Sequence, residues 1–199
     1  MPRKSRNLQI QDGDSFHTMW QCHNKSFLFE SEFIKGRYYE LLLKYATKFG
    51  VKIHAYCFMS SHPHLYGTLS SVPDFIKFQH VVNLGLAKEI NKKYDRVGQV
   101  VRDRYKVVRI EHSAQEFKTQ LYIDLNPVQS GIVSHPKHYP WSSFHYYAYE
   151  KDDILITPSQ GYLSLGSDDL QRRSRYLELI EIWVERSKIL KEINEIPHP

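Results

Sequence analysis

Two histidines and a tyrosine–asparagine pair are the residues of this chain whose types and spacing could do chemistry together. His62 and His64 are separated by one residue. Side chains alternate between the faces of an extended strand, so we expect both imidazoles on the same side. Tyr122 and Asn126 are four residues apart, which places them on one face of a helix. Imidazoles and an amide oxygen can bind a metal ion and a phenol can act as nucleophile, so the set suggests metal-assisted attack on a phosphodiester.

Each of these residues also has an ordinary structural interpretation. The two histidines could be strand residues that hydrogen bond to backbone carbonyls, and Tyr122 is one of 14 tyrosines. Asn126 could simply cap a helix before Pro127, because asparagine favours helix ends. Three further histidines have no partner at a suitable spacing, and we interpret them as structural: His54, His80 and His112.

The elements expected to position these residues follow the order strand, helix, strand, strand, helix, strand. Alternating or apolar runs predict strands over 16–22, 51–59, 62–69 and 98–110. Helical spacing of apolar residues predicts helices over 31–49 and 73–94, with Ser31 as the first cap and Gly50 as the stop. This order is that of the ferredoxin-like βαββαβ arrangement, an α+β fold with a central antiparallel sheet.

The second half of the chain is expected to add helices to this fold. A helix over 114–126 would carry Tyr122, and Pro127 should end or kink it at Asn126. The segment 132–165 contains three prolines and many aromatic residues and is predicted to form surface loops. A long helix should begin at 167–169, with an apolar face made of Leu170, Leu177, Ile180, Val184 and Leu190. The expected organisation is a flexible basic arm (1–14), a catalytic domain (15–150), and a loop with a C-terminal helical extension (151–199).

Four ordered motifs resemble one family of DNA-processing enzymes. The segment from Tyr56 to Leu65 looks like the His-hydrophobic-His strand of the HUH single-tyrosine transposases, and Tyr122–Val128 with Gly131 looks like their tyrosine helix. Arg104-Tyr105-Lys106 and Pro140-Trp141-Ser142-Ser143 are similar to segments of the REP-associated tyrosine transposases, an insertion-sequence-200-like branch. The resemblance extends from about residue 16 to about residue 147.

This resemblance implies a transposase, a single-stranded DNA endonuclease that cleaves and rejoins DNA through a 5′-phosphotyrosine intermediate. Tyr122 would be the catalytic nucleophile, and His62, His64 and Asn126 would be the metal ligands. Ligand chemistry alone permits zinc, manganese or magnesium. The family favours Mg²⁺ or Mn²⁺. Short members of the superfamily are dimers, but the REP-associated branch is typically monomeric, so a monomer is favoured and a homodimer stays open.

Basic and aromatic residues are the expected DNA-binding groups. The formal net charge is +5, which suits a polyanionic partner such as single-stranded or hairpin DNA. The candidates are Arg3, Lys4 and Arg6 in the arm, Arg102, Arg104 and Lys106 on one face of the fourth predicted strand, and Trp141. The three strand residues could equally form a solvated basic edge, and Trp141 could pack in the core rather than stack on bases.

Composition narrows the compartment and the class of protein. Two cysteines, Cys22 and Cys57, are too few for a disulfide scaffold and are expected to be buried and reduced. No apolar run approaches the roughly 20 residues of a membrane span, and no signal-peptide core precedes the domain. A cytoplasmic protein without a membrane partner is the expectation.

Departures from the family motif leave two alternatives open. Pro63 stands where an aliphatic residue is usual, Ser60-Ser61 replaces Pro-Asn, and Gln129-Ser130 replaces Arg-Ala. Such changes could mark a catalytically degenerate or domesticated nucleic-acid-binding module of the same fold. A metal-dependent nuclease that uses water, with Tyr122 only packing, is the third interpretation.

Overall fold

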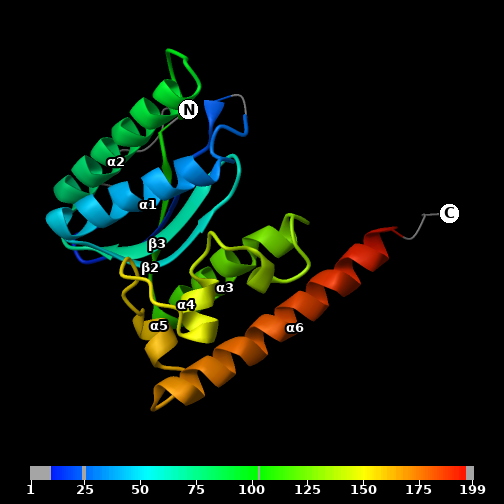
Figure 1. The fold of residues 1–199 in the computed structure, drawn as a ribbon. Coiled ribbons are helices and arrows are strands. Elements are labelled where there is room, and N and C mark those ends of the chain that lie inside the picture. The colour runs from blue at the N-terminus through cyan, green and yellow to red at the C-terminus, as the bar shows by residue number, and fades with distance from the viewer. Residues whose placement is uncertain (1–9, 24–25, 103, 196–199) are drawn as a thin grey trace, which may run out of the picture.

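The computed structural model describes residues 10–23, 26–102 and 104–195, and side chains as far as residue 187 (Figure 1). The first elements are β1 (Ser15–Met19), α1 (Glu32–Ala46), η3 (Thr47–Phe49), β2 (Val51–Phe58), β3 (Pro63–Leu69), α2 (Val72–Lys93) and β4 (Lys106–Ile110). They are followed by α3 (Ser113–Gln129), η4 (Pro136–His138), α4 (Phe144–Tyr149), α5 (Gln160–Leu163) and α6 (Asp169–Glu195).

The sheet has four strands in the order β2-β3-β1-β4, and every neighbouring pair is antiparallel. This strand order with the element order βαββαβ confirms the predicted ferredoxin-like α+β fold. In the central pairing Met19 lies opposite His64 and His17 lies opposite Tyr66. Because directly opposed residues point to the same side, these four side chains share one face of the sheet.

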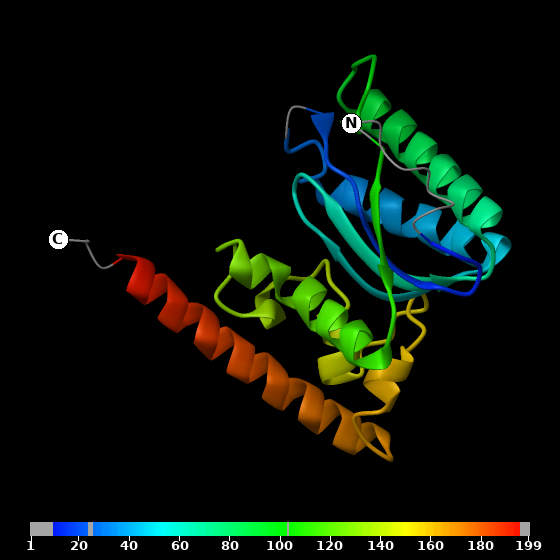
Figure 2. The ribbon, with the colours of Figure 1, turned by 180° about the vertical axis from the view of Figure 1, so that it is seen from behind.

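Helices cover both faces of the sheet. α1 and α2 lie on one face and α3 lies on the other (Figures 1 and 2). The first layer buries Phe16, Phe58 and Leu65 in the larger core, and the second packs Cys57 with Ile123 of α3 in a smaller one. Since side chains on a strand alternate, the residues of β2 and β3 divide between the two cores, and the His64 face belongs to α3.

The strand expected over 98–110 is shorter in the structure. β4 covers only Lys106–Ile110, and Val101 makes an isolated bridge with Cys22. The Gln99 side chain donates to the Val101 and Arg102 carbonyls, so these carbonyls bond locally and not along a sheet ladder. The prediction that Arg102, Arg104 and Lys106 alternate along one strand face is therefore wrong, because only Lys106 lies in the strand.

The helix that carries Tyr122 continues past the predicted end. α3 runs to Gln129 with Pro127 inside it. Pro127 removes one helical hydrogen bond, the one to the Ile123 carbonyl, and only two helix residues follow it. The helix ends at Ser130, whose N–H bonds to the Asn126 carbonyl at 2.9 Å, and Gly131 then adopts a φ of 72°.

The segment 132–165 was expected to form surface loops, but it contributes to the core. It contains η4, α4 and α5, and it buries Phe144, Tyr147 and Tyr162. The aromatic rings of this segment pack against Tyr176 of α6, with the Tyr147 and Tyr162 ring centroids 4.5 Å apart. Apolar burial against α3 and α6 explains its aromatic content better than surface exposure does.

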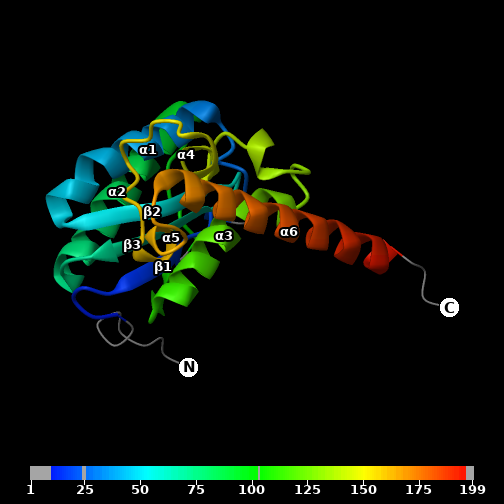
Figure 3. The same ribbon diagram turned by 90° about the horizontal axis from the view of Figure 1, so that it is seen from below.

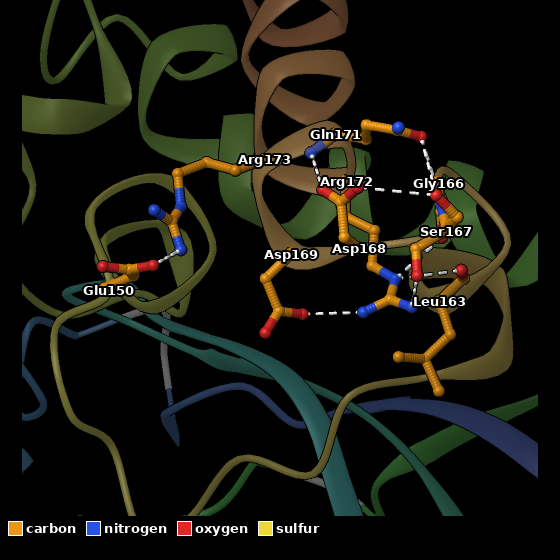
Figure 4. A network of polar contacts seen from close by, with 9 residues as sticks. All are labelled: Glu150, Leu163, Gly166, Ser167, Asp168, Asp169, Gln171, Arg172 and Arg173. Carbon is orange, nitrogen blue, oxygen red and sulfur yellow. Dashed lines mark hydrogen bonds and ion pairs between the residues drawn. The ribbon is translucent and has the colours of Figure 1, made fainter.

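α6 is a long helix that crosses beside α3 and projects beyond the rest of the molecule (Figure 3). The side chain of Asp168 accepts the Gln171 N–H at 2.9 Å and so caps the helix start. Arg172 ties this start to the preceding segment through the Leu163 and Gly166 carbonyls (Figure 4). The expected apolar face is partly correct: Ile180 and Val184 are buried, Leu170 is 75% exposed, and the side chain of Leu190 lies outside the described residues.

Residues 10–14 pack on the domain and do not belong to the arm expected over 1–14. Ile10 is buried in the core, and the Asp12 carboxylate accepts the backbone N–H of Val72 at 2.7 Å. The Gly13 N–H bonds to the Leu69 carbonyl at 3.0 Å. The candidate DNA-binding residues Arg3, Lys4 and Arg6 lie outside the described residues. No helix of the described part is long and apolar enough to cross a membrane.

Candidate active site

The two histidines of the His-x-His motif lie side by side at the beginning of β3. Their ring centroids are 4.9 Å apart. The turn before β3 is closed by a bond from the Met59 N–H to the His62 carbonyl at 3.0 Å, and Pro63 is the first strand residue, paired with Phe58. A strand start is where a proline is best tolerated, so Pro63 does not disturb the spacing of the pair.

Tyr122 of α3 closes the site from the other side. Its ring centroid lies 5.7 Å from that of His64, at a nearly perpendicular angle. The side chain remains 43% exposed, although the neighbouring residues of α3 are buried. The structure thus brings the predicted nucleophile to the predicted metal-binding histidine across the space between helix and sheet.

His17 of β1 belongs to the same group and was not among the residues predicted from the sequence. Its Nε2 lies 3.0 Å from Nδ1 of His64, and its ring contacts the Tyr122 ring edge-on at 5.9 Å between centroids. A signal was available: β1 and β3 are neighbours in a ferredoxin-like sheet, so an inward-facing histidine on the first strand had to lie near the motif. The spacing along the chain alone does not show this contact.

Burial keeps these histidines neutral. Removal from water lowers the pKa of His17 to about 4 and that of His64 to about 2, with the neighbouring rings as a smaller cause for His64. Burial also lowers the pKa of His62. A neutral imidazole has one N–H and one lone pair, so a single proton occupies the hydrogen bond between His17 and His64.

The ring nitrogens that remain point to a ligand for the pair. Nδ1 of His62 lies 3.0 Å from the Ser61 hydroxyl, and Nδ1 of His64 is engaged by His17. Nε2 of His64 is buried and finds no hydrogen-bond partner in the described part of the chain. Buried polar atoms normally have a partner, so this nitrogen fits a group that binds there.

The donor set limits what kind of metal site this could be. Among the described side chains, those of residues 10–23, 26–102 and 104–187, no three His, Cys, Asp or Glu are grouped to hold a metal ion. An ion at the histidine pair would therefore need oxygen ligands from another residue type or from the substrate. Asn126, the predicted third ligand, is buried one helical turn after Tyr122.

Asp124, two residues after Tyr122, holds the helix to the elements behind it. Its carboxyl is fully buried and accepts hydrogen bonds from the Ser143 hydroxyl at 2.6 Å and the Tyr176 hydroxyl at 2.8 Å. Burial raises the pKa of Asp124 to about 7, and the two hydroxyl donors oppose that shift. Asp124 was not among the residues predicted from the sequence, although a carboxylate between the apolar Ile123 and Leu125 was a visible signal.

The predicted DNA-binding residues do not form one group. Arg102, Arg104 and Lys106 are exposed, and Lys106 pairs with Met19 at the edge of the sheet. Trp141 stacks on Phe58 at 6.0 Å between centroids, and its indole N–H donates to Glu32. These contacts give Trp141 a packing role in the protein. They do not support the prediction that its ring stacks on DNA bases.

The family of the chain follows from a comparison with known protein families. The family described as "Transposase IS200 like" matches residues 12–126, which include both motif histidines and Tyr122. The chain belongs to the IS200-like transposase family. Among the curated proteins, none matches this sequence.

Solved structures support the same fold. A REP-associated tyrosine transposase bound to a REP hairpin is similar with a TM-score of 0.59 and 20% identity, over 79% of this chain and 93% of that one. A "putative transposase" from Deinococcus radiodurans gives a TM-score of 0.39 and 17% identity, over 62% of this chain and 96% of that one. The first likeness establishes the shared fold, and the second is too low to carry an argument.

Proposed function

We propose that this IS200-like transposase cleaves and rejoins single-stranded DNA with Tyr122 as its nucleophile. The observation that carries the proposal is the contact of the half-exposed Tyr122 ring with the buried His64 ring. A tyrosine used only for packing would have no reason to stay exposed above a histidine whose Nε2 lacks a hydrogen-bond partner in the described residues. The placement of a nucleophile beside a phosphate-binding group is what covalent phosphoryl transfer needs.

The proposed cleavage and rejoining steps need no external energy source, because each exchanges one P–O bond for another. The Tyr122 oxygen attacks the scissile phosphorus and loses its proton, a new P–O bond forms, and the bond to the 3′-oxygen breaks. The departing 3′-oxygen takes up a proton, which leaves a 5′-phosphotyrosine and a free 3′-hydroxyl. Attack by another 3′-hydroxyl reverses the step and joins strands.

His62 and His64, with Asn126, are the residues that would hold Mg²⁺ or Mn²⁺. Such an ion would supply Lewis-acid polarisation of the phosphate. The chain's own contribution is to prepare the imidazoles: the Ser61 hydroxyl and His17 occupy the two Nδ1 atoms, so both Nε2 lone pairs can face a ligand. In this state the shared proton lies on Nδ1 of His64 and is donated to Nε2 of His17.

The expected substrate is a DNA hairpin with a single-stranded flank. The similar REP-associated transposase is bound to a REP hairpin. The net charge of +5 and the exposed Arg102, Arg104 and Lys106 favour a polyanion on this chain as well. The same branch is typically monomeric, so we propose that this protein acts as a monomer.

The test is a denaturing gel after incubation with labelled hairpin DNA and Mn²⁺. We expect a retarded covalent band for the wild type and no band for Tyr122→Phe, which removes only the nucleophilic oxygen. DNA binding by the phenylalanine variant should stay within about twofold of wild type, since exposed substitutions change free energies by only about 0.5 kcal/mol. Free cleavage products without a covalent band would indicate a water-dependent nuclease, and binding without cleavage would indicate a degenerate module.

A further inference from the structure

A second candidate site lies on the face of the sheet opposite to Tyr122. A cavity of about 580 Å³ opens between α2 and the segment that leads into β4. Its size falls within the range of small-ligand pockets. Its lining includes Ile76, Gln79, Asn83, Ala87, Val100 and Arg104.

Two amide side chains in this cavity each have one buried atom without a hydrogen-bond partner among the described residues. Gln79 is 1% exposed, and its Nε2 finds no hydrogen-bond partner in the described part of the chain. The same holds for Oδ1 of Asn83, one helical turn further along α2. Because the oxygen and nitrogen of an amide are interchangeable in assignment, each of the two can offer a donor and an acceptor. Buried groups of this kind usually have a partner, so the cavity fits a ligand with polar edges.

The apolar lining of the cavity and its cation narrow the chemical class of the ligand. Ile76, Ala87 and Val100 supply apolar surface, and Val100 and Tyr105 are part of the core beneath. Arg104 is the one cation among the described lining residues, which include no carboxylate. An apolar slot with two amides and a cation at its rim matches an unpaired nucleobase attached to phosphate. A side-chain amide pairs best with adenine, to which it can donate and from which it can accept.

β4 provides the path from this cavity to the site of Tyr122. It is the edge strand of the sheet, and it leads directly into α3. Arg102 and Lys106 are exposed along this route. A DNA strand that passed around this edge would meet cations on the way, as single-stranded DNA grooves require.

We propose that this cavity binds one unpaired base of the DNA substrate, with adenine preferred. Gln79 and Asn83 would pair with the base edge, and Arg104 would contact the adjoining phosphate. This inference rests on the proposed function, because it assumes that single-stranded DNA is the substrate. It adds a base-reading site separate from the phosphate chemistry at Tyr122.

The test compares affinities for a labelled hairpin whose single-stranded flank consists of adenines, thymines or abasic sites. Wild type should bind the adenine flank about tenfold more tightly than the abasic flank, the effect of one good amide–base pair. Gln79→Met and Asn83→Leu should each remove that preference. Both variants should keep or raise the thermal midpoint, because they replace an unpartnered buried polar group by an apolar one of similar size.

Gln120→Met is the matched control. Gln120 of α3 is also a buried glutamine with an unpartnered Nε2 in the described structure, but it lies outside this cavity. Its replacement should leave the adenine preference unchanged. If Gln79→Met lowers the thermal midpoint, Asn83→Leu decides between a structural role and base binding.

The remaining outcomes separate this inference from the proposed function. Equal flank preference in wild type and both variants would overturn the cavity assignment and leave covalent cleavage intact. Base preference without a covalent band would retain the cavity and overturn the proposed function. Free dAMP that bound as tightly as the flanked hairpin would overturn the assignment to a DNA strand in favour of a free nucleotide.

Discussion

The ring nitrogens of the histidines decide what this site can bind. His64 uses Nδ1 for His17 and has Nε2 left over, buried and without a partner in the described residues. In the other tautomer of the pair, Nε2 of His17 carries the shared proton and the single proton of neutral His64 lies on its Nε2, where it would block a ligand. When His17 accepts this hydrogen bond, it holds His64 in the tautomer whose Nε2 can act as a ligand.

His17→Phe tests this selection at the level of one residue. The phenyl ring keeps the packing against Tyr122 but accepts no hydrogen bond, so we expect manganese affinity to fall about 10- to 100-fold, as for other partners of metal-binding histidines. Isothermal titration calorimetry measures this directly. His17→Gln retains an acceptor and should recover part of the affinity.

The control for this prediction is His23→Ala, an exposed histidine outside the site. Its manganese affinity should equal that of wild type. Should His17→Phe and His23→Ala bind the ion equally well, the proposed role of His17 in orienting His64 is wrong.

Sequence reasoning located residues whose neighbours follow from local periodicity. The period of two predicted that His62 and His64 share a face, and the structure places their rings together. His17 and Asp124 were missed because their partners, His64, Ser143 and Tyr176, come from other elements. A hydrogen bond between distant segments depends on register and packing, which a short motif does not contain.

The position of Tyr122 depends on how its helix, α3, is attached to neighbouring elements. α3 is fixed from behind through Asp124, which bonds to α6 through Tyr176 and to the segment before α4 through Ser143. The helix that carries the proposed nucleophile is thus held by a buried carboxyl group. Its protonation links the stability of this part of the fold to pH.

Asp124→Asn should change the pH dependence of stability. A carboxyl whose pKa rises from 3.8 in the unfolded chain to about 7 in the fold binds more protons when folded. The unfolding free energy of wild type relative to the asparagine variant should therefore fall as the pH rises from about 4 to about 7, and level off above that. Urea unfolding of both proteins across this range provides the measurement, and a constant difference would contradict the assignment.

α6 should stabilise the fold only through the face that packs against the rest of the protein. Ile180 is fully buried and Leu170 is 75% exposed, although both are apolar residues of the same helix. Ile180→Ala should lower the unfolding free energy by about 2–5 kcal/mol through lost contacts and the cavity left behind. Leu170→Ala should change it by less than about 0.5 kcal/mol, and equal losses in urea unfolding would mean that α6 packs differently.

Two elements differ from their prediction for reasons that concern their surroundings. The alternation of Arg102, Arg104 and Lys106 had the period of a strand, but side-chain bonds from Gln99 occupy the carbonyls there. Pro127 was expected to end a helix that in fact continues to Gln129, because this proline removes one hydrogen bond and the bond from Ser130 to the Asn126 carbonyl still forms. Propensity describes the isolated segment, whereas neighbouring groups decide which of its hydrogen bonds form.

The whole molecule combines a basic character with a site on one face and a cavity on the other. Its net charge of +5 predicts that DNA affinity falls steeply with salt, since each neutralised phosphate releases counterions. Affinity for a hairpin with a single-stranded flank should exceed that for blunt duplex at matched salt. Fluorescence anisotropy over a salt series would measure both the salt dependence and this preference. Equal affinities for the flanked hairpin and the blunt duplex would favour a generic basic DNA binder.

The register between β1 and β3 limits which insertions and deletions would keep the contact between His17 and His64. One residue inserted between Ser15 and His17 would turn His17 towards α1 and α2, away from His64. Two inserted residues would restore the face but move the ring about 6.6 Å along the strand, too far for a contact of 3.0 Å. Deletions act in the same way. Related chains that keep this histidine contact should therefore vary in length between their strands and not within β1 or β3.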